Sequence, residues 1–332
     1  MTLNFSNKKT YIIAEAGVNH NGRINLAKKL IFEAKKAGAD AVKFQTFDTG
    51  SVVTRFAVQA PYQTKNMKKK EKQFDMLKRY ELKNEDYFLL KNYCKKIKID
   101  FISSVFDEQG VDFLLNNIGS KVIKLPSGEI NNYLILNKLK LSNYKILIST
   151  GMSNYEDIVN AINTIAKKKI YKLKNLKPIV INIKYFNKLK KNICIMHCVT
   201  DYPVSKKQAN LKCIDNIKKD FKLVTGYSDH TLGVLAPTIA VTKGATVIEK
   251  HFTLNKKMKG PDHLASLEPK EFLKMVKNIR EYELMNGKGE KKLQQCEIQN
   301  SKVARKSVVA KIIINKNEIF TLKNLTVKRP GT

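Results

Sequence analysis

The chain has 332 residues, 43% of them hydrophobic, and 62 Lys and Arg residues against 29 Asp and Glu residues give a formal net charge of +33. This length is enough for one large core and a small appended module. We expect no membrane partner, because the sequence has no apolar run of about 18 residues. We also expect no signal peptide, because Met1–Thr10 lacks an apolar stretch. The five cysteines show no CxxC spacing, which favours free thiols and a cytoplasmic location.

The positive charge does not by itself indicate a nucleic-acid-binding protein. Only six of the basic residues are Arg, the residue best suited to bidentate contacts with phosphates and bases. No nucleic-acid-binding motif is present, and we interpret the basic runs Lys68–Lys70, Lys167–Lys169 and Lys188–Lys191 as solvated loops or helix ends. We therefore expect no nucleic-acid partner.

Eight short apolar segments alternate with amphipathic ones over residues 1–285. The predicted strands are Tyr11–Ala16, Ala41–Thr46, Asp100–Val105, Lys121–Ser127, Lys145–Thr150, Asn192–Thr200, Lys222–Ser228 and Thr246–His251. The predicted helices between them include Leu26–Ala37, Tyr87–Lys96, Val111–Asn117, Asp157–Lys167, Ala209–Lys219 and Gly233–Lys243. This alternation favours an α/β fold of the (β/α)8 TIM-barrel type, although a doubly wound open sheet alternates in the same way.

Polar side chains gather where these predicted strands end. Barrel interiors are apolar, so polar and charged groups there would cost folding free energy unless they are used. Both candidate folds place their ligands at the carboxyl ends of parallel strands. The strand-end residues are Glu15, Lys43, Gln45, Ser104, Lys124, Ser127, Glu129, Ser149, Thr200, Tyr202, His230 and His251.

The last two predicted strands each bring a histidine to the same edge of the sheet. His230 follows Lys222–Ser228 closely, His251 ends Thr246–His251, and the apolar helix Gly233–Lys243 lies between them. A strand–helix–strand unit makes its two strands parallel neighbours. Two neutral imidazoles at one edge can share a divalent cation. The alternative is a pair of unrelated structural histidines.

One irregular segment, Lys167–Lys191, is rich in lysine, contains an apolar patch at 178–181, and joins the fifth helix to the sixth strand. Loops of this kind lie on the non-catalytic face of a barrel, so we expect a decoration without chemistry.

A second irregular segment begins at the sequence Asn286-Gly287-Lys288-Gly289, which predicts a glycine C-cap for the last barrel helix. We therefore divide the chain into a barrel over 1–285, a linker over 286–300 and a small module over 301–332. In that module Ser307–Ile314 and Leu322–Val327 alternate like short strands around a turn at Lys316-Asn317-Glu318. The module is too short to hold a core alone.

Eight motifs, in one order along the chain, resemble those of the sialic acid synthases, the bacterial N-acetylneuraminate synthase group that also includes legionaminate and pseudaminate synthases. The motifs are Ala14-Glu15-Ala16-Gly17-Val18-Asn19-His20-Asn21-Gly22, Val42-Lys43-Phe44-Gln45-Thr46, Lys124-Leu125-Pro126-Ser127-Gly128-Glu129, Ser149-Thr150-Gly151-Met152, Tyr227-Ser228-Asp229-His230-Thr231, Glu249-Lys250-His251-Phe252-Thr253, Gly260-Pro261-Asp262-His263 and Val327-Lys328-Arg329-Pro330-Gly331.

The resemblance implies a (β/α)8 barrel followed by a C-terminal antifreeze-like (SAF) module that is swapped across a homodimer. Because the chain stops at Thr332, we expect that module to be truncated. The implied reaction is a carbon–carbon bond-forming transfer in which phosphoenolpyruvate condenses with N-acetylmannosamine and releases phosphate, with Mn²⁺ or Mg²⁺ as cofactor. The alternative acceptor is the 2,4-diacetamido-2,4,6-trideoxy-mannose of legionaminate synthases.

The resemblance also implies roles for individual residues. His230 and His251 would be the metal ligands, and Glu15 the base that activates water, with Glu129 as the second candidate. The residues that would hold the phosphate and carboxylate of phosphoenolpyruvate are Lys43, Lys124, Ser104, Ser127, Ser149 and Ser228. The residues that would grip the sugar are Gln45, Tyr202 and Asp262, together with Thr200 as a further substrate contact and Arg329 reaching from the partner subunit.

The sequence departs from the family pattern in places, and two other function classes stay open. Ser103-Ser104-Val105-Phe106 replaces Ser-Thr-Pro-Phe, which keeps a hydroxyl group, and Asn317 replaces a glycine in the SAF turn, where Asn tolerates a left-handed backbone. One rival class is a different metal-dependent aldolase or hydrolase on the same barrel. The other is a non-catalytic binding protein.

Overall fold

The structure is a computed structural model that describes residues 3–5 and 9–331. Residues 1–2, 6–8 and 332 lie outside the described residues. The expectations that concern Met1–Thr10 and the chain end at Thr332 therefore fall partly outside the described structure. The chain divides into two compact units, Met1–Met285 and Asn286–Thr332.

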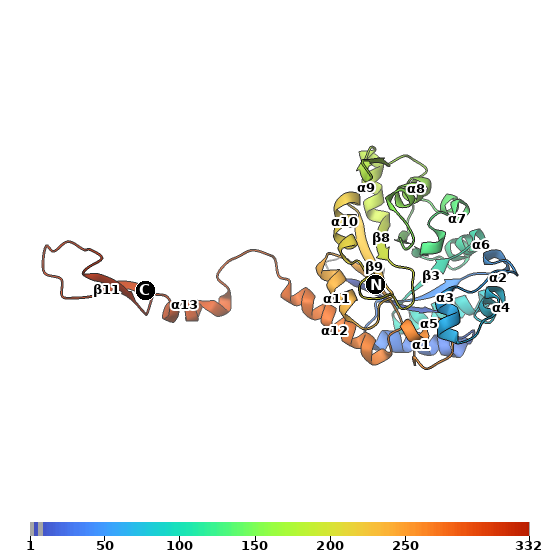
Figure 1. Cartoon of the computed structure of the whole chain (residues 1–332), viewed down its shortest axis with the longest axis horizontal. Coiled ribbons are helices and arrows are strands. Elements are labelled where there is room, and N and C mark those ends of the chain that lie inside the picture. The colour runs from blue at the N-terminus through green and yellow to red at the C-terminus, as the bar shows by residue number, and fades with distance from the viewer. Residues whose placement is uncertain (1–2, 6–8, 332) are drawn as a thin grey trace. The chain divides into compact units, whose positions relative to one another are not determined.

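The first unit contains a closed barrel of parallel strands in the order β1-β10-β9-β8-β5-β4-β3-β2 (Figure 1). The barrel prediction is therefore confirmed, and the open doubly wound sheet was wrong. The barrel strands are β1 (Tyr11–Gly17), β2 (Ala41–Thr46), β3 (Asp100–Val105), β4 (Val122–Leu125), β5 (Lys145–Ser149), β8 (Ile193–Cys198), β9 (Val224–Asp229) and β10 (Val247–His251).

Helices follow the strands and surround the barrel. The long ones begin and end near their predicted bounds, whereas α2, α3 and α4, which lie between β2 and α5, were not predicted. The helices of this unit are α1 (Ile24–Lys36), α2 (Thr49–Val52), α3 (Pro61–Met67), α4 (Gln73–Lys78), α5 (Asn84–Ile97), α6 (Glu108–Asp112), η1 (Phe113–Asn117), η2 (Ser127–Glu129), α7 (Tyr133–Lys138), α8 (Tyr155–Ala166), α9 (Ile183–Asn192), α10 (Lys212–Phe221), α11 (Leu235–Thr242), η3 (His263–Ala265) and α12 (Pro269–Met285).

Helix α8 shows why such a segment becomes a helix. The side chain of Asn154 accepts hydrogen bonds from the backbone N–H groups of Glu156 and Asp157. The Asp157 carboxylate in turn accepts a hydrogen bond from the backbone N–H of Asn154. This capping box satisfies donors that the first helical turn leaves free. Ile158 and Ile162 then lie on the buried face, where the hydrophobic effect stabilises the helix against the barrel.

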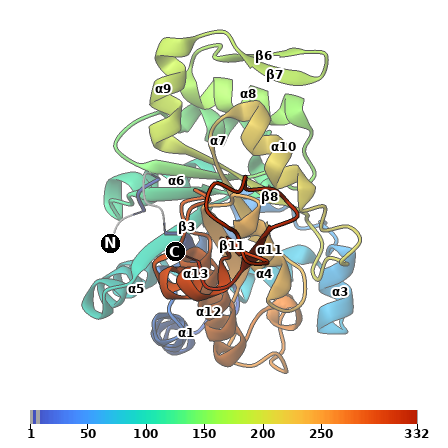
Figure 2. The ribbon, with the colours of Figure 1, turned by 90° about the vertical axis from the view of Figure 1, so that its left-hand side faces the viewer.

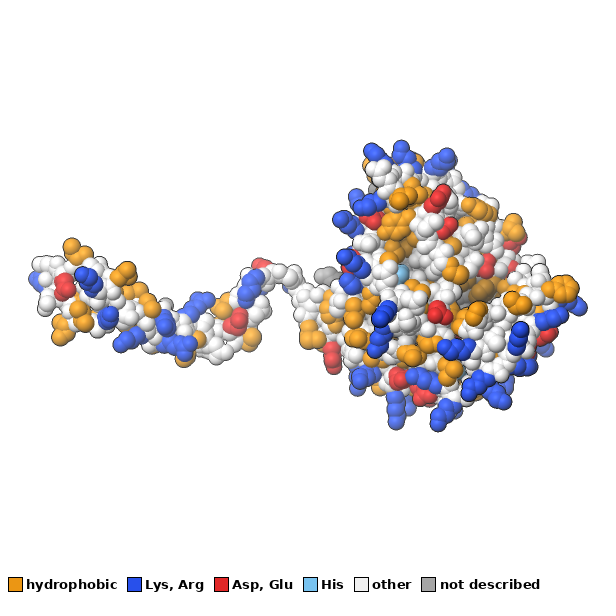
Figure 3. Space-filling view, in the orientation of Figure 1, with side chains coloured by type: hydrophobic (Ala, Val, Ile, Leu, Met, Phe, Trp, Pro, Cys, Tyr) orange, Lys and Arg blue, Asp and Glu red, His pale blue; other side chains and the backbone are white. Residues whose placement is uncertain are grey.

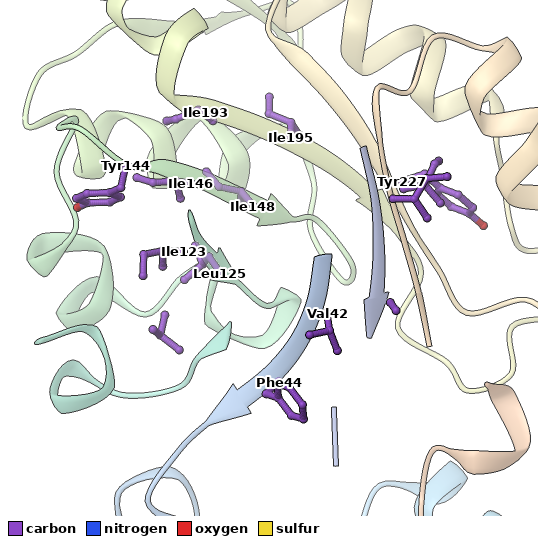
Figure 4. Close-up of a cluster of buried hydrophobic side chains, with 14 of the residues drawn as sticks. Val42, Phe44, Ile123, Leu125, Tyr144, Ile146, Ile148, Ile193, Ile195 and Tyr227 are labelled. Carbon is purple, nitrogen blue, oxygen red and sulfur yellow. The ribbon is translucent and has the colours of Figure 1, made fainter. Parts of the chain in front are cut away.

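Successive residues of each strand point to opposite faces, and this alternation produces two layers in the core. Val42, Phe44, Ile146 and Ile148 point outward and pack against the helices (Figure 4). A second buried cluster fills the inside of the barrel and consists of Leu3, Ile13, Ala41, Ile102, Val122, Leu147, Cys194, Met196 and Val247. The inward positions nearer the carboxyl ends of the strands are polar. The apolar cluster therefore fills the barrel toward the amino ends of the strands, and polar side chains line it toward their carboxyl ends.

Several predicted strand ends were placed too far out. Ser127 belongs to the 3-10 turn η2 rather than to β4, because Pro126 has no N–H with which to continue the ladder. Thr200 lies beyond the end of β8, and Asn192 is the last residue of α9. The predicted strand Lys222–Ser228 is β9, which begins at Val224 because Lys222 adopts a left-handed conformation that ends α10.

The segment Lys167–Lys191 is more regular than the sequence suggested. It forms an antiparallel hairpin of β6 (Tyr171–Lys174) and β7 (Lys177–Val180), followed by α9 (Figure 2). The Tyr171 ring packs against Phe221 of α10, and its hydroxyl donates to the Phe221 carbonyl at 2.6 Å. The hairpin precedes β8 in the chain, as expected for an αβ connection.

The second unit contains a 3-10 turn η4 (Gln295–Glu297), α13 (Ile298–Ala304) and an antiparallel pair of β11 (Ser307–Ala310) and β12 (Leu325–Lys328). Both strands are shorter than predicted, and α13 begins inside the stretch predicted as linker. Asn317 has a φ of 68°, the left-handed conformation that Asn tolerates. Ile313 and Leu322 are exposed.

Lys and Arg side chains are distributed over the visible face of the molecule and are interspersed with carboxylates (Figure 3). Within the described part of the chain, none of the helices has the length and apolar character needed to cross a membrane.

Candidate active site

The inward polar side chains line a cavity of about 360 Å³ at the carboxyl ends of the barrel strands. All the predicted site residues of the first unit reach this cavity, although they come from the eight barrel strands and the loops that follow them. They are Glu15, Lys43, Gln45, Ser104, Lys124, Ser127, Glu129, Ser149, Thr200, Tyr202, Ser228, His230, His251 and Asp262.

Lys43 is buried at the centre of this constellation. Its ammonium lies 2.8 Å from Glu15 Oε2, donates to Ser104 Oγ at 2.8 Å, and lies 3.7 Å from Glu249 Oε2. Burial alone would lower the pKa of Lys43, but Glu15 and Glu249 outweigh it and raise the pKa. The side chain is therefore a buried cation, which explains how an ammonium is tolerated in an apolar strand.

Lys124 is held by the same glutamate. Glu249 Oε1 accepts from Lys124 Nζ at 3.2 Å and from Ser228 Oγ at 2.9 Å. Burial would raise the pKa of Glu249, but Lys124 and Lys43 together lower it to about 2. Glu249 is thus an anion that positions two cations, and both ammonium groups face the cavity.

Glu15 differs from Glu249 in its protonation. Burial raises the pKa of Glu15 to about 7 against the opposing effect of Lys43, and the negative charge of Glu249 adds to the rise. Gln45 Nε2 donates to Glu15 Oε1 at 3.2 Å. A carboxyl group with a pKa near neutrality can accept and return a proton at physiological pH.

Hydroxyl groups from three neighbouring strand ends meet beside these charges. Ser127 Oγ accepts from the backbone N–H of Gly151 at 3.0 Å. Ser149 Oγ and Thr200 Oγ1 are buried without a hydrogen-bond partner among the described residues. A Cβ added to Gly151 would lie 2.1 Å from Thr200 Oγ1 and 2.8 Å from Ser127 Oγ, so glycine is needed for this close approach.

His230 and His251 lie together at the ends of the neighbouring strands β9 and β10, which we call the histidine wall, with ring centroids 5.4 Å apart. His230 Nδ1 is 2.7 Å from the Val199 carbonyl oxygen. Burial would lower the pKa of His230, but Cys198 and the Val199 carbonyl outweigh it and raise the pKa, so Nε2 can bind a cation only after the ring loses one proton. Burial and the charges of His230 and Lys43 lower the pKa of His251 well below its usual value, so this imidazole is neutral. Its Nδ1 is buried and forms no hydrogen bond with any part of the chain that is described.

This donor set fits a divalent cation held by two imidazoles whose other positions are filled by water or substrate. Within residues 3–5 and 9–331 there is no group of three or more His, Cys, Asp or Glu side chains with metal-site geometry. The nearest carboxylate oxygen is Asp262 Oδ2, 3.8 Å from His251 Nδ1, and burial raises the pKa of Asp262 to about 6.

Two further predicted residues have distinct surroundings. Glu129 Oε2 accepts from Asn132 at 2.7 Å, and burial raises the Glu129 pKa. Arg329 belongs to the second unit, where its Nε donates to the Ala304 carbonyl at 2.9 Å.

Some cavity residues were not assigned a role from the sequence. Glu249 stood in a recognised motif, and its position two residues before His251 placed it on the same face of the strand. Tyr62 lines the cavity from α3, a segment with no clear periodicity in the sequence, and Asn66 of the same helix lies outside the lining. Tyr62 packs on Tyr202 with a centroid distance of 4.6 Å, and Asn66 donates to the carbonyl groups of Tyr202 and Pro261.

Comparison with known proteins identifies the family. Residues 30–291 match the NeuB family. An N,N'-diacetyllegionaminic acid synthase of Campylobacter jejuni is 46% identical over 98% of this chain and 91% of its own length. An N-acetylneuraminate-9-phosphate synthase of Mus musculus is 36% identical over 96% of this chain and 82% of its own length.

A solved structure has the same architecture. The N-acetylneuraminic acid (sialic acid) synthetase of Leptospira borgpetersenii aligns with a TM-score of 0.70 and 29% identity, covering 88% of this chain and 90% of that one. The chain belongs to the NeuB family, the sialic acid synthase group.

Proposed function

We propose that this NeuB family protein condenses phosphoenolpyruvate with the open-chain aldehyde of an N-acetylated amino sugar and releases phosphate. The observation that carries the proposal is the pair of buried lysines, Lys43 and Lys124, which face one cavity with hydroxyl groups from neighbouring strand ends. Phosphoenolpyruvate presents a phosphate and a carboxylate, and charged donors on adjacent strands suit both.

In this reaction the lysines and the residues around them would hold phosphoenolpyruvate and transfer a proton. Lys43 and Lys124, with Ser104, Ser149 and Ser228, would hold the two anionic groups so that C3 faces the aldehyde carbon. C3 attacks that carbon with the electron pair of the C2–C3 double bond. The carbonyl π electrons move to the aldehyde oxygen, which takes up the proton that water releases and becomes a hydroxyl group. Water adds at C2, its oxygen bonds to carbon, and its proton passes to Glu15. The tetrahedral centre then expels phosphate by cleavage of the C2–O bond, which leaves a 2-keto acid.

The sugar would lie toward the histidine wall, near Gln45, Tyr202 and Asp262. His230 and His251 would hold Mn²⁺ or Mg²⁺, and such a cation polarises a carbonyl oxygen and stabilises the alkoxide that forms there. Glu129 is the second candidate for the base, because its raised pKa also suits proton transfer. We further propose a homodimer in which the C-terminal segment belongs to an antifreeze-like (SAF) module and places Arg329 at the partner's sugar site.

Two acceptors fit this reaction. N-acetylmannosamine follows from the motif pattern, whereas the 46% identity to a legionaminic acid synthase supports 2,4-diacetamido-2,4,6-trideoxy-mannose. Apolar side chains of Val52, Met76, Leu77 and Phe106 also line the cavity, and they suit an acceptor that carries a methyl group in place of a hydroxymethyl group.

Phosphate release measured with both substrates together, and with each alone, tests the proposal. We expect release only when both are present, and the ratio of kcat/KM for the two acceptors then identifies the sugar. Phosphate release from phosphoenolpyruvate alone would contradict the synthase assignment. So would the absence of release when phosphoenolpyruvate is combined with either acceptor.

A further inference from the structure

An ion pair lies directly behind the two histidines, on the outer side of the barrel wall. Asp229 Oδ2 is 2.5 Å from Lys250 Nζ, and both side chains are fully buried. The two residues are register partners on β9 and β10, and neither belongs to the residues that line the cavity. Each one immediately precedes a histidine, His230 in one strand and His251 in the other.

The pair also binds the backbone on the far side of His230. Asp229 Oδ1 accepts from the Thr231 backbone N–H at 2.8 Å and from the Tyr227 hydroxyl at 2.9 Å. Lys250 Nζ donates to the Thr231 carbonyl oxygen. His230 is therefore held between two residues, Asp229 and Thr231, that share the same buried ammonium.

Stability alone does not account for this arrangement. Removing two charges from water costs several kcal/mol per ion in general, and well-packed apolar side chains of similar volume are often as stable as a buried ion pair or more so. Apolar side chains, however, would not bind the N–H and C=O groups of Thr231. What the pair supplies is a direct link between the end of β9 and the end of β10.

We propose that Asp229 and Lys250 are positioning residues that hold His230 and His251 at the separation and orientation needed to share one divalent cation. The inference rests on the proposed metal binding by these histidines. It assigns the pair no contact with substrate or cation. Replacement of a residue that orients a metal ligand typically lowers metal affinity by about 10- to 100-fold.

The test uses the full chain with the double substitution D229N/K250Q, which removes both charges and keeps polar groups of similar size. Mn²⁺ binding is measured without substrates, by titration with detection of free Mn²⁺ by electron paramagnetic resonance. Circular dichroism checks that the protein is folded at the temperature used. We expect Mn²⁺ affinity to fall about 10- to 100-fold in the folded variant. If the double variant does not fold, D229N alone is measured, with a loss of affinity again expected.

A second ion pair, which lies at the amino end of the strands and is partly exposed, provides a control. Asp40 Oδ2 lies 3.0 Å from Arg280 Nη2 and also accepts from the Ile12 backbone N–H. The double substitution D40N/R280Q should lower the melting temperature without changing Mn²⁺ affinity.

The outcomes separate this inference from the proposed function. Wild-type Mn²⁺ affinity in a folded pair variant would overturn the positioning role and leave the synthase assignment intact. Equal losses of affinity in both double variants would also overturn it, because the effect would then follow from general destabilisation. If the wild-type protein bound no Mn²⁺, both the metal assignment and this inference would fail.

Discussion

Replacing Lys43 by Met should weaken the use of phosphoenolpyruvate far more than the use of the sugar. The Lys43 ammonium lies 2.8 Å from both Glu15 Oε2 and Ser104 Oγ, so it is oriented before substrate arrives. Loss of one hydrogen bond from a charged donor to a phosphate or carboxylate costs about 2–3 kcal/mol. That free energy corresponds to a rise of roughly 30- to 150-fold in the KM for phosphoenolpyruvate. Lys124→Met should have a similar effect on the same constant.

The two lysine variants should differ in their pH dependence. Lys43 opposes the burial that raises the pKa of Glu15 to about 7, so its removal should raise that pKa further. Glu15 acts as a base only when it is ionised, and activity falls as the pH drops through its pKa. The acid limb of the rate profile should therefore move to higher pH in Lys43→Met. In Lys124→Met it should stay in place, because Lys124 contacts Glu249 rather than Glu15.

Initial rates of phosphate release give both results. Each substrate is varied at a saturating level of the other, at pH values on both sides of 7, and circular dichroism verifies folding. Lys121→Met is the control, because this exposed lysine precedes β4 and lies outside the cavity lining. Equal rises in KM for the two substrates would refute the assignment of the lysines. The same pH shift in both variants would refute the coupling between Lys43 and Glu15.

Three further predictions concern the base, the histidines and Arg329. Glu15→Gln keeps the shape of the side chain, so kcat should fall while the KM for phosphoenolpyruvate changes little. The acid limb of the rate profile near pH 7 should disappear. An unchanged kcat would exclude Glu15 as the base. His230→Ala and His251→Ala should each abolish turnover in a folded protein, and Mn²⁺ should restore the chelated wild type but neither variant; near-normal rates in a chelated variant would contradict the metal site. Mixing Arg329→Ala with His251→Ala subunits should restore activity in mixed dimers, because one site per dimer then keeps both residues; no recovery in verified heterodimers would exclude a shared site.

The barrel was predictable because its strands are buried on both faces. Such strands appear in a sequence as short, nearly continuous apolar runs, and segments such as Ala41–Thr46 and Asp100–Val105 were placed at their observed bounds. Strand ends were less predictable, because the last residue depends on which neighbour continues the hydrogen-bonded ladder. For example, β4 ends at Leu125, although the sequence predicted a strand that reached Ser127.

Short elements without periodicity could not be predicted in the same way. Helices α2, α3 and α4 have four to seven residues each, too few for an apolar period to be visible. Half of residues 171–180 in the hairpin β6–β7 are exposed, and Tyr171 contacts Phe221, which lies 50 residues further along the chain. Tertiary contacts of this kind leave no local signal, so the sequence did not predict Tyr62 in the cavity lining or the hydrogen bonds of Asn66 to Tyr202 and Pro261.

The sequence also contained enough information to predict Glu249 as a site residue. It lies two residues before His251 and must share the inward face of β10, where a carboxylate needs a cation. Lys43 and Lys124 were already expected at strand ends, but the register of the closed barrel is needed to show that they meet Glu249. The four charges of Lys43, Lys124, Glu15 and Glu249 sum to zero when all are ionised. A phosphate and a carboxylate then bring negative charge into a buried site that has no surplus cation among these four groups. A divalent cation held by His230 and His251, as proposed above, would add positive charge to this site.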